Sequence, residues 1–309
     1  MNNLLSYNEF KSILNAKLFE DSFSDLLTKI AENPDRYIGL FRPTKPKTKL
    51  IQNITQSHEI KYGDALECIF ERYFEALGFQ TLPKRFTNQQ GKTYDIDQLF
   101  TNGNTIFMIE QKVRDDHDST KKVGQFSNFE SKYFELTQIY PNRTIVPIMW
   151  FIDDSLQKNR NYYIGEMNRM ADDYECACHL FYGDRLFGAN NGGIEELDIA
   201  MWNEVIDYLE FWKNTLPDMP EVNFDLRAQE VFEEIKDLPP VVYRKLLNNN
   251  NIVEQIFPII FPEHTVLHLL SEFFGTKCSP VYSSLKNKIE NYLLSTESIA
   301  ADNRIAYCK

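Results

Sequence analysis

The sequence has few cysteines and no long apolar run, and these absences exclude several classes of protein. Its five cysteines are irregularly spaced and include no Cys-x-x-Cys pair, so a disulfide framework is excluded. No stretch of about 18 apolar residues and no charged-then-apolar leader occurs, so we expect a soluble, cytoplasmic protein without membrane contact. The Walker, Rossmann and Gly-x-Ser-x-Gly fingerprints are absent as well.

Positive charge is scarce overall, but it is unevenly distributed. The chain has a formal net charge of −12, whereas a nucleic-acid binder is expected to be basic at its footprint. Between positions 42 and 122 there are 13 basic and 11 acidic residues, while the rest of the chain has 20 basic and 34 acidic residues. The region 42–122 is therefore predicted to contact a phosphate backbone, with acidic surface elsewhere limiting indiscriminate adhesion to DNA.

The strongest local signal lies in two short segments, 94–100 and 105–113, on either side of Asn102-Gly103. An Asn-Gly pair between apolar strand formers predicts a β-hairpin. If these two residues form the centre of the turn, Asp95 on the first strand lies directly opposite Glu110 on the second. Acidic groups from both strands are then expected to meet.

Because side chains alternate along a strand, four charged residues of this hairpin are predicted to share one face. They are Asp95, Asp97, Glu110 and Lys112. Carboxylates within reach of one another repel and need a cation, and oxygen ligands suit Mg²⁺, for which Mn²⁺ is expected to substitute. The amine of Lys112 can neutralise a phosphate or position a water. Such a set fits metal-assisted cleavage of a phosphodiester.

The order of Asp97, a hairpin and Glu110-Gln111-Lys112 resembles the signature of the PD-(D/E)xK nuclease superfamily. That superfamily includes type II restriction endonucleases, junction resolvases and repair nucleases. The resemblance covers roughly residues 59–190, and Ile96 stands where the motif name has proline, as in many members. The Gly-x-x-x-Glu motif from Gly63 to Glu67, within a helix predicted over 60–77, is similar to one found in many members. The resemblance therefore implies that Glu67 assists at the metal site.

Two aspartates compete for the metal-binding role on the first strand. The turn geometry favours Asp95, whereas the family pattern favours Asp97, which lies just before the apolar end of its strand. We take Asp97 and Glu110 as the principal ligands and keep Asp95 in reserve. Glu67 is expected to be an additional or outer ligand, and Lys112 to orient or activate the attacking water.

The resemblance implies an α/β (α+β) fold with a restriction-endonuclease-like mixed central sheet flanked by helices, and with helical additions at both ends. Three segments are expected: an N-terminal helical segment with a basic arm over 1–58, a catalytic core over 59–197, and a mainly helical region over 198–309 for DNA recognition, dimer contacts or both. Sequence patterns predict individual elements as follows: helical periodicity over 3–33, an extended arm over 42–49, helices over 60–77, 122–140 and 160–175, and strands over 143–152 and 177–182. Pro147 within the apolar run 143–152 predicts an edge strand, a bulge or a short strand.

The function implied is Mg²⁺-dependent, site-specific cleavage of double-stranded DNA by a bacterial type II restriction enzyme, leaving 5′-phosphates. A homodimer is expected because duplex cleavage needs two active sites, and a DNA methyltransferase is expected as a genetic partner. The predicted DNA contacts are Lys45, Lys47, Lys49, Lys84, Arg85, Arg114, His117, Lys121, Lys122 and Gln125.

Two alternatives remain open at this point. A structure-specific repair nuclease or junction resolvase shares the fold and the metal chemistry but recognises DNA structure. A noncatalytic DNA-binding protein with a nuclease-like fold would bind DNA without cutting it.

Overall fold

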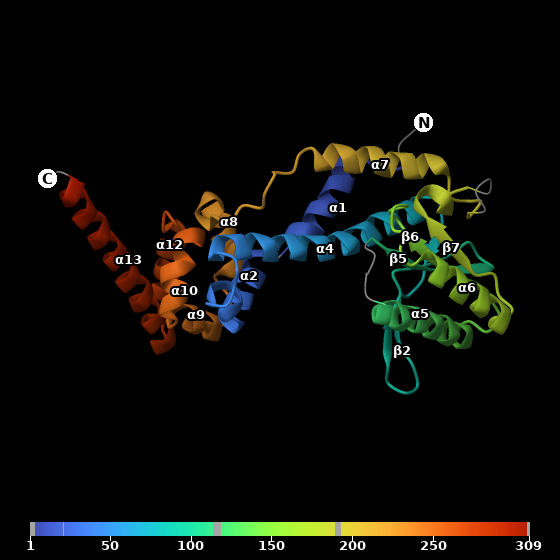
Figure 1. The fold of residues 1–309 in the computed structure, drawn as a ribbon, viewed down its shortest axis with the longest axis horizontal. Helices are drawn as coiled ribbons and strands as arrows, with labels where there is room; N and C mark the ends of the chain where they lie inside the picture. The colour runs from blue at the N-terminus through green and yellow to red at the C-terminus, as the bar shows by residue number, and fades with distance from the viewer. Residues whose placement is uncertain (1–3, 21, 114–118, 189–192, 308–309) are drawn as a thin grey trace. The chain divides into compact units, whose positions relative to one another are not determined.

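The computed structural model describes residues 4–20, 22–113, 119–188 and 193–307 (Figure 1). Within these residues no helix is long and apolar enough to cross a membrane. The chain forms two compact units, each assembled from two stretches of sequence. One unit, here called the sheet unit, consists of Met1–Lys17 and Lys61–Leu216, and the other, here called the helical unit, consists of Leu18–Ile60 and Pro217–Lys309. The roles assigned to segments 1–58, 59–197 and 198–309 stay predictions.

The sheet unit contains a five-stranded sheet with the strand order β1-β4-β5-β6-β7. Its strands are β1 (Gln80–Thr81), β4 (Gln98–Thr101), β5 (Thr105–Lys112), β6 (Thr144–Phe151) and β7 (His179–Tyr182). The pairs β1–β4 and β4–β5 are antiparallel, whereas β5–β6 and β6–β7 are parallel. The predicted mixed central sheet is confirmed.

Helices cover both faces of this sheet, which explains why β5 and β6 are almost continuously apolar. The covering helices are α4 (Pro46–Ala76), α5 (Ser119–Ile139), α6 (Arg160–Tyr174) and α7 (Ile199–Lys213). Helices α5 and α6 pack on the face that carries Met108 and Met149, and Figure 1 shows them beside β5, β6 and β7. On the opposite face, the Trp150 ring contacts Phe70 of α4 at a centroid distance of 4.7 Å and Trp202 of α7 at 6.0 Å. The helices expected over 122–140 and 160–175 are confirmed as α5 and α6.

The prediction that Pro147 marks an edge, a bulge or a short strand is wrong. Strand β6 has eight residues and lies between β5 and β7. Pairing with β7 begins only at Ile148, so Pro147 lies where β6 has a partner on one side only. Because proline lacks an N–H group, this is the part of an interior strand where the missing donor costs least.

The extended arm expected over 42–49 is only partly correct, because helix α4 begins at Pro46 and runs to Ala76. The helix was expected to begin near residue 60. Proline is favoured at the first position of a helix, where its fixed φ is already suitable and its missing N–H group would be unpaired anyway. The sequence therefore carried a start signal at Pro46. The C-terminal end is as predicted, since Gly78 follows with a φ of +91°.

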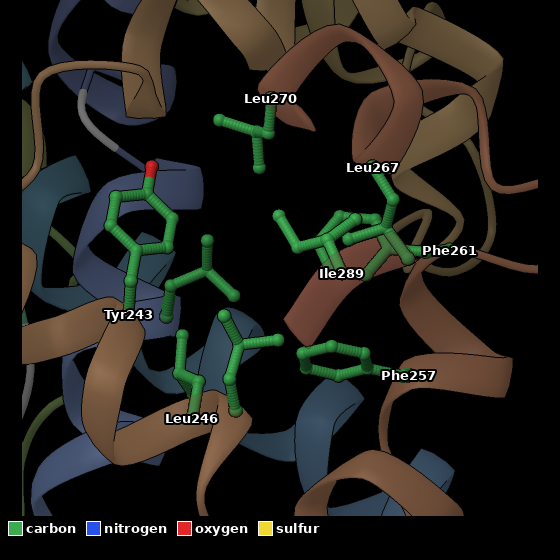
Figure 2. A pocket seen from close by; sticks show the side chains of 9 residues that line it. Tyr243, Leu246, Phe257, Phe261, Leu267, Leu270 and Ile289 are labelled. Carbon is green, nitrogen blue, oxygen red and sulfur yellow. The ribbon is translucent and has the colours of Figure 1, made fainter. Parts of the chain in front are cut away.

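The helical unit has an apolar core of its own. The elements that build it are α2 (Ser22–Glu32), α3 (Asp35–Ile38), the first part of α4, η3 (Phe224–Arg227), α8 (Ala228–Ile235), α9 (Pro240–Leu247), α10 (Asn250–Gln255), α11 (Phe257–Ile260), α12 (Thr265–Thr276) and α13 (Pro280–Tyr307). A small gap in this core is lined by apolar side chains, among them Leu246, Phe257, Leu270 and Ile289 (Figure 2). The polar hydroxyl of Tyr243 donates a hydrogen bond to the Ile235 carbonyl. The gap is therefore a feature of packing, with no polar group to orient a ligand.

Candidate active site

The β4–β5 hairpin forms, but its register differs by two residues from the predicted one. Leu99 pairs with Met108 and Gln98 with Ile109. Continuing this register by one step places Asp97 opposite Glu110, whereas the predicted turn placed Asp95 there. The predicted pairing is therefore wrong, and the correct pairing favours Asp97. A shift of two residues leaves the side chains of β4 and β5 on their predicted faces, because side chains alternate with period two.

The register differs because the turn is wider than two residues. Thr101 pairs with Ile106, which leaves four residues in the loop. The Thr101 hydroxyl donates to the Thr105 carbonyl at 2.6 Å and accepts from the Gly103 N–H at 3.0 Å. The Asn102 side chain accepts from the Thr105 N–H at 3.3 Å. These side-chain hydrogen bonds stabilise the longer loop, and Gly103 takes the positive φ of +117° that such a turn needs.

Asp95 belongs to a different piece of sheet. It ends strand β3 (Thr93–Asp95), which pairs with β2 (Arg85–Thr87) in a separate two-stranded ribbon. There Asp95 lies opposite Arg85 and is exposed to solvent. Asp95 is therefore not brought opposite Glu110, and its reserve role as a metal ligand stays a prediction.

Three of the predicted site residues converge at the end of β5. The Lys112 Nζ atom lies 2.7 Å from Glu110 Oε1 and 3.9 Å from Asp97 Oδ2. The backbone N–H of Gln111 donates to Asp97 Oδ2 at 2.7 Å, which fixes the orientation of that carboxylate. Two carboxylates thus share one cationic group. This is the arrangement expected of two acidic groups that can bind a common cation.

A second lysine, which the sequence analysis missed, completes the cluster. Lys132 of α5 is only 3% exposed, and its Nζ atom lies 2.6 Å from Glu110 Oε2. Lysine is almost never fully buried unless it is paired. A signal was present: Lys132 falls at the i+3 position of the apolar stripe formed by Phe129, Tyr133 and Leu136, all of which are buried. A charged residue inside an apolar stripe predicts a buried partner.

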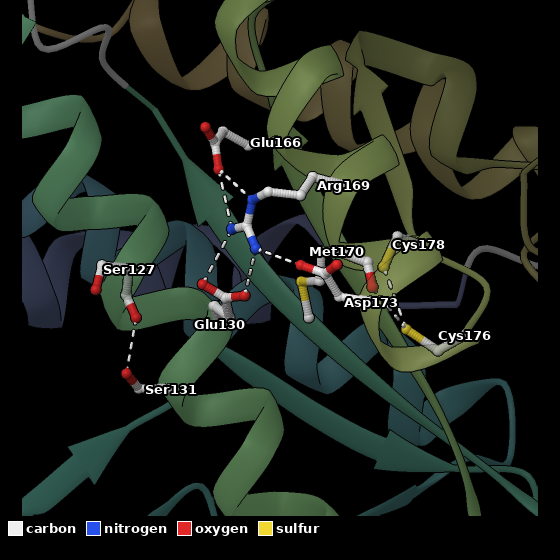
Figure 3. A network of polar contacts seen from close by, with 9 residues as sticks. All are labelled: Ser127, Glu130, Ser131, Glu166, Arg169, Met170, Asp173, Cys176 and Cys178. Carbon is white, nitrogen blue, oxygen red and sulfur yellow. Dashed lines mark hydrogen bonds and ion pairs between the residues drawn. The ribbon is translucent and has the colours of Figure 1, made fainter.

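Arg169 links α6 to helix α5, which supplies Lys132. Arg169 of α6 contacts both carboxylate oxygens of Glu130 on α5, at 3.0 and 3.1 Å, and it also pairs with Glu166 and Asp173 on its own helix (Figure 3). The planar guanidinium is suited to such bidentate pairing. The two helices are thereby held in register, which helps to keep Lys132 directed at Glu110.

Burial and neighbouring charges shift the protonation of the cluster. Burial, reinforced by the negative charge of Glu110, raises the pKa of Asp97 from 3.8 to about 6. Burial also acts to raise the pKa of Glu110, but the charges and hydrogen bonds of Lys112 and Lys132 outweigh it and lower that pKa below its ordinary value. For Lys112, burial favours the neutral form, yet the two carboxylates raise its pKa. We conclude that Glu110 and Lys112 are charged at neutral pH.

Glu67 approaches the same region from α4. Burial raises its pKa from 4.5 to about 8, and the negative charge of Asp97 adds to this effect. The Glu67 backbone carbonyl accepts a hydrogen bond from Gln98 Nε2 at 2.7 Å, which joins α4 to the start of β4. Among the described residues, however, no three acidic, histidine or cysteine side chains are grouped closely enough to hold a metal ion. The role of Glu67 as a ligand stays a prediction.

The donor set nevertheless fits a hard divalent cation. Asp97 and Glu110 supply oxygen ligands, which Mg²⁺ prefers. The pKa values of Asp97 and Glu67 are raised first by burial and then by repulsion from neighbouring carboxylates. A cation bound between the carboxylates would remove this repulsion.

The residues predicted to contact DNA differ in their exposure and in their side-chain partners. Lys84 is part of the scaffold, because its Nζ atom lies 2.7 Å from Glu71 Oε2 and 3.1 Å from the Asp97 carbonyl. Lys122 donates to Asn159 and lies 4.8 Å from the centre of the Tyr162 ring. The other positions are distributed as follows: Lys45, Lys47, Arg85 and Lys121 are exposed, Lys49 and Gln125 are half-buried, and Arg114 and His117 lie outside the described residues. Their roles in DNA binding stay predictions.

Comparison with known proteins finds similarity in the part of the chain that carries this site. Residues 78–213, somewhat less than half of the chain, match the family model described as type II restriction endonuclease, HinfI. The type II restriction enzyme HinfI of Haemophilus influenzae is 38% identical over 82 residues, which are 26% of this chain and 31% of that enzyme. The match thus spans about a third of the relative's length. No solved structure matches the chain.

Proposed function

We propose that this chain, whose residues 78–213 match the HinfI family model of type II restriction endonucleases, is a Mg²⁺-dependent endonuclease that cuts double-stranded DNA at a specific sequence. The observation that carries the proposal is the cluster of Asp97, Glu110 and Lys112 at the end of the β4–β5 hairpin. These residues lie inside the region that matches the family. Two oxygen ligands beside an amine are the groups that metal-assisted phosphodiester hydrolysis requires.

Each residue of the cluster has a distinct role in this proposal. Asp97 and Glu110 would hold the ion, with Glu67 nearby as an outer ligand. Mg²⁺, when bound, supplies a Lewis acid that polarises the phosphate and lowers the pKa of the attacking water. Lys112 orients that water and stabilises the charge that develops on the phosphate oxygens. Water adds to phosphorus as the bond to the 3′-oxygen breaks, which leaves a 5′-phosphate and a 3′-hydroxyl.

Lys132 is a positioning residue in this scheme. It holds Glu110 Oε2 from the α5 side, while Lys112 contacts Glu110 Oε1. If Lys112 turns from Glu110 toward a bound substrate, Lys132 still holds the carboxylate in place. Lys112 is then released toward the substrate without leaving Glu110 free to rotate.

The proposal includes the partners that such an enzyme needs. One chain carries a single cluster of this kind among its described residues, so cutting both strands is expected to involve a homodimer. A DNA methyltransferase encoded nearby would protect host DNA, and the enzyme would act in the bacterial cytoplasm. Mn²⁺ is expected to replace Mg²⁺, since it accepts the same oxygen ligands.

Digestion of an unmethylated plasmid tests this proposal directly. The purified chain with Mg²⁺ should give discrete bands, EDTA should prevent their formation, and end-sequencing should find one common sequence and 5′-phosphates. Cutting only at branched or damaged DNA would favour a repair nuclease or junction resolvase. Binding without any cutting at high enzyme concentrations would favour a noncatalytic DNA-binding protein.

A further inference from the structure

Two adjacent apolar side chains in the helical unit are almost completely exposed. Leu40 is 90% exposed and Phe41 is 97% exposed, and both lie between α3 and α4. The next most exposed large apolar side chain among the described residues is Leu226, at 65%. Burying a side chain of this size is worth about 1.5–3 kcal/mol, so exposing two neighbours forgoes considerable stabilisation. Such an exposure calls for a binding partner.

Leu40 and Phe41 occupy the two central positions of a tight turn. The turn is closed by a hydrogen bond of 3.1 Å from the Arg42 N–H to the Gly39 carbonyl. Central positions of turns usually carry glycine, proline, asparagine, aspartate or serine. The base of the turn is well defined, because a Cβ atom at Gly39 would lie 2.4 Å from the Asp35 carbonyl oxygen, so only glycine fits there. The two apolar side chains therefore form a projecting tip on a fixed base.

The chain around this tip is strongly basic. From position 36 to position 58 there are five lysines and arginines and no aspartate or glutamate, in a protein whose net charge is −12. The side chains of Arg42, Lys45 and Lys47 are exposed, and no hydrogen bond or ion pair joins them to the described residues. An apolar tip beside exposed cations complements a polyanion that has apolar surface between its charges. Duplex DNA is such a polyanion, because its phosphates flank stacked bases.

We propose that Leu40 and Phe41 insert between neighbouring base pairs of duplex DNA, while Arg42, Lys45 and Lys47 contact the phosphates on either side. Apolar wedges of one or two side chains are known to unstack a base step and bend the duplex. The size of the tip favours DNA over an anionic membrane, because two side chains bury much less apolar area than membrane-surface helices do. This inference rests on the proposed function in so far as both require DNA binding.

Binding of the full chain to DNA in EDTA separates insertion from cleavage. The probe is a duplex fragment that the wild type binds in EDTA, with 2-aminopurine substituted at successive adenines. The double variant Leu40→Ala/Phe41→Ala should bind about 10- to 100-fold more weakly, as expected for the loss of stacking with bases. Wild-type protein should raise the 2-aminopurine fluorescence at one step, and the double variant should not. Leu226→Ala, an exposed apolar residue of the same unit, is the matched control and should bind within about twofold of wild type.

Salt dependence distinguishes the tip from the cations beside it. Lys45→Ala/Lys47→Ala should reduce the slope of log affinity against log salt by about two, because two phosphate contacts are lost. Leu40→Ala/Phe41→Ala should weaken binding at every salt concentration and leave the slope unchanged. These surface substitutions do not affect the core, which unchanged thermal melting should verify.

Several outcomes would overturn the proposal. Wild-type affinity and fluorescence in the Leu40→Ala/Phe41→Ala variant would exclude insertion. Loss of dimer in sedimentation, with DNA binding unchanged, would assign the tip to a second copy of the chain, and loss of binding to phosphatidylserine vesicles alone would assign it to a membrane. Wild-type protein that binds DNA but never cuts it would refute the proposed function and leave the insertion intact, whereas absence of DNA binding would refute both.

Discussion

Glu67→Gln is predicted to change how the stability of the sheet unit depends on pH. Burial and the neighbouring carboxylates raise the pKa of Glu67 to about 8 in the folded protein, while its ordinary value is 4.5. Between these values the folded protein retains a proton that the unfolded chain has released. Stability of the wild type therefore falls as pH rises through this window, and it levels off above pH 8.

The size of this change in the free energy of unfolding follows from the pKa shift of Glu67. A shift from 4.5 to about 8 corresponds to about 5 kcal/mol if it is fully realised. Solvent reaches part of the Glu67 side chain, so screening should reduce the loss to about 2–3 kcal/mol. Glutamine carries no titrating proton. The difference in unfolding free energy between Glu67→Gln and wild type should therefore grow by about 2–3 kcal/mol from pH 5 to pH 8.5 in favour of the variant.

Urea unfolding followed by tryptophan fluorescence measures this difference in the sheet unit, to which Glu67 belongs. The protein has three tryptophans, at positions 150, 202 and 212, and all belong to the sheet unit. Glu75→Gln is the matched control, since Glu75 lies on the same helix but is exposed. Its curve should run parallel to that of wild type. If the Glu67→Gln curve also ran parallel to wild type, Glu67 would not hold its proton in the folded state and the account of its burial would be refuted.

Further predictions concern the lysines around the site. Lys132→Met removes one of the two cations from buried Glu110 and should cost about 3–5 kcal/mol in urea unfolding, so an unchanged midpoint would contradict the buried pair. Lys132→Arg should recover part of this loss because it retains the charge. Lys112→Ala should bind DNA in EDTA within a few-fold of wild type and lose more than about 10²-fold in cleavage rate, and normal cutting would remove this lysine from the mechanism. Lys84→Ala should reduce cleavage more than DNA affinity, since Lys84 holds Glu71 and the Asp97 carbonyl, and the opposite ratio would indicate a direct phosphate contact.

The hairpin face shared by Asp97, Glu110 and Lys112 could be predicted from the sequence. The residue that lies opposite Glu110 could not. Alternation along a strand fixes which side chains share a face, and a shift of two residues preserves that face. The width of the turn decides the pairing. It depends on the hydrogen bond that the Thr101 hydroxyl donates and on the one that the Asn102 carboxamide oxygen accepts. An Asn-Gly pair in a sequence predicts a two-residue turn and carries no information on these side-chain hydrogen bonds. The family pattern favoured Asp97, which is the residue that the observed register, continued by one step, places opposite Glu110.

Other features depend on contacts between distant parts of the chain. Lys132 is buried because α5 packs across β5, and no local pattern identifies Glu110 as its partner 22 residues away. The helical unit joins Leu18–Ile60 to Pro217–Lys309, a pairing of segments that periodicity cannot reveal. The exposure of Leu40 and Phe41 could not be predicted from the sequence for a related reason. Two apolar residues in a sequence are ordinarily expected to be buried, and only the fold shows that they are not.

The most direct test of the proposed metal site compares Asp97→Asn with Asp95→Asn in plasmid cleavage with Mg²⁺. The two substitutions have the same chemistry and lie two residues apart, but only Asp97 lies beside Glu110 and Lys112. Asp97→Asn should abolish cleavage, and Asp95→Asn should cut at close to the wild-type rate. Normal cutting by Asp97→Asn, or loss of cutting only in Asp95→Asn, would contradict the assignment of this cluster as the catalytic centre.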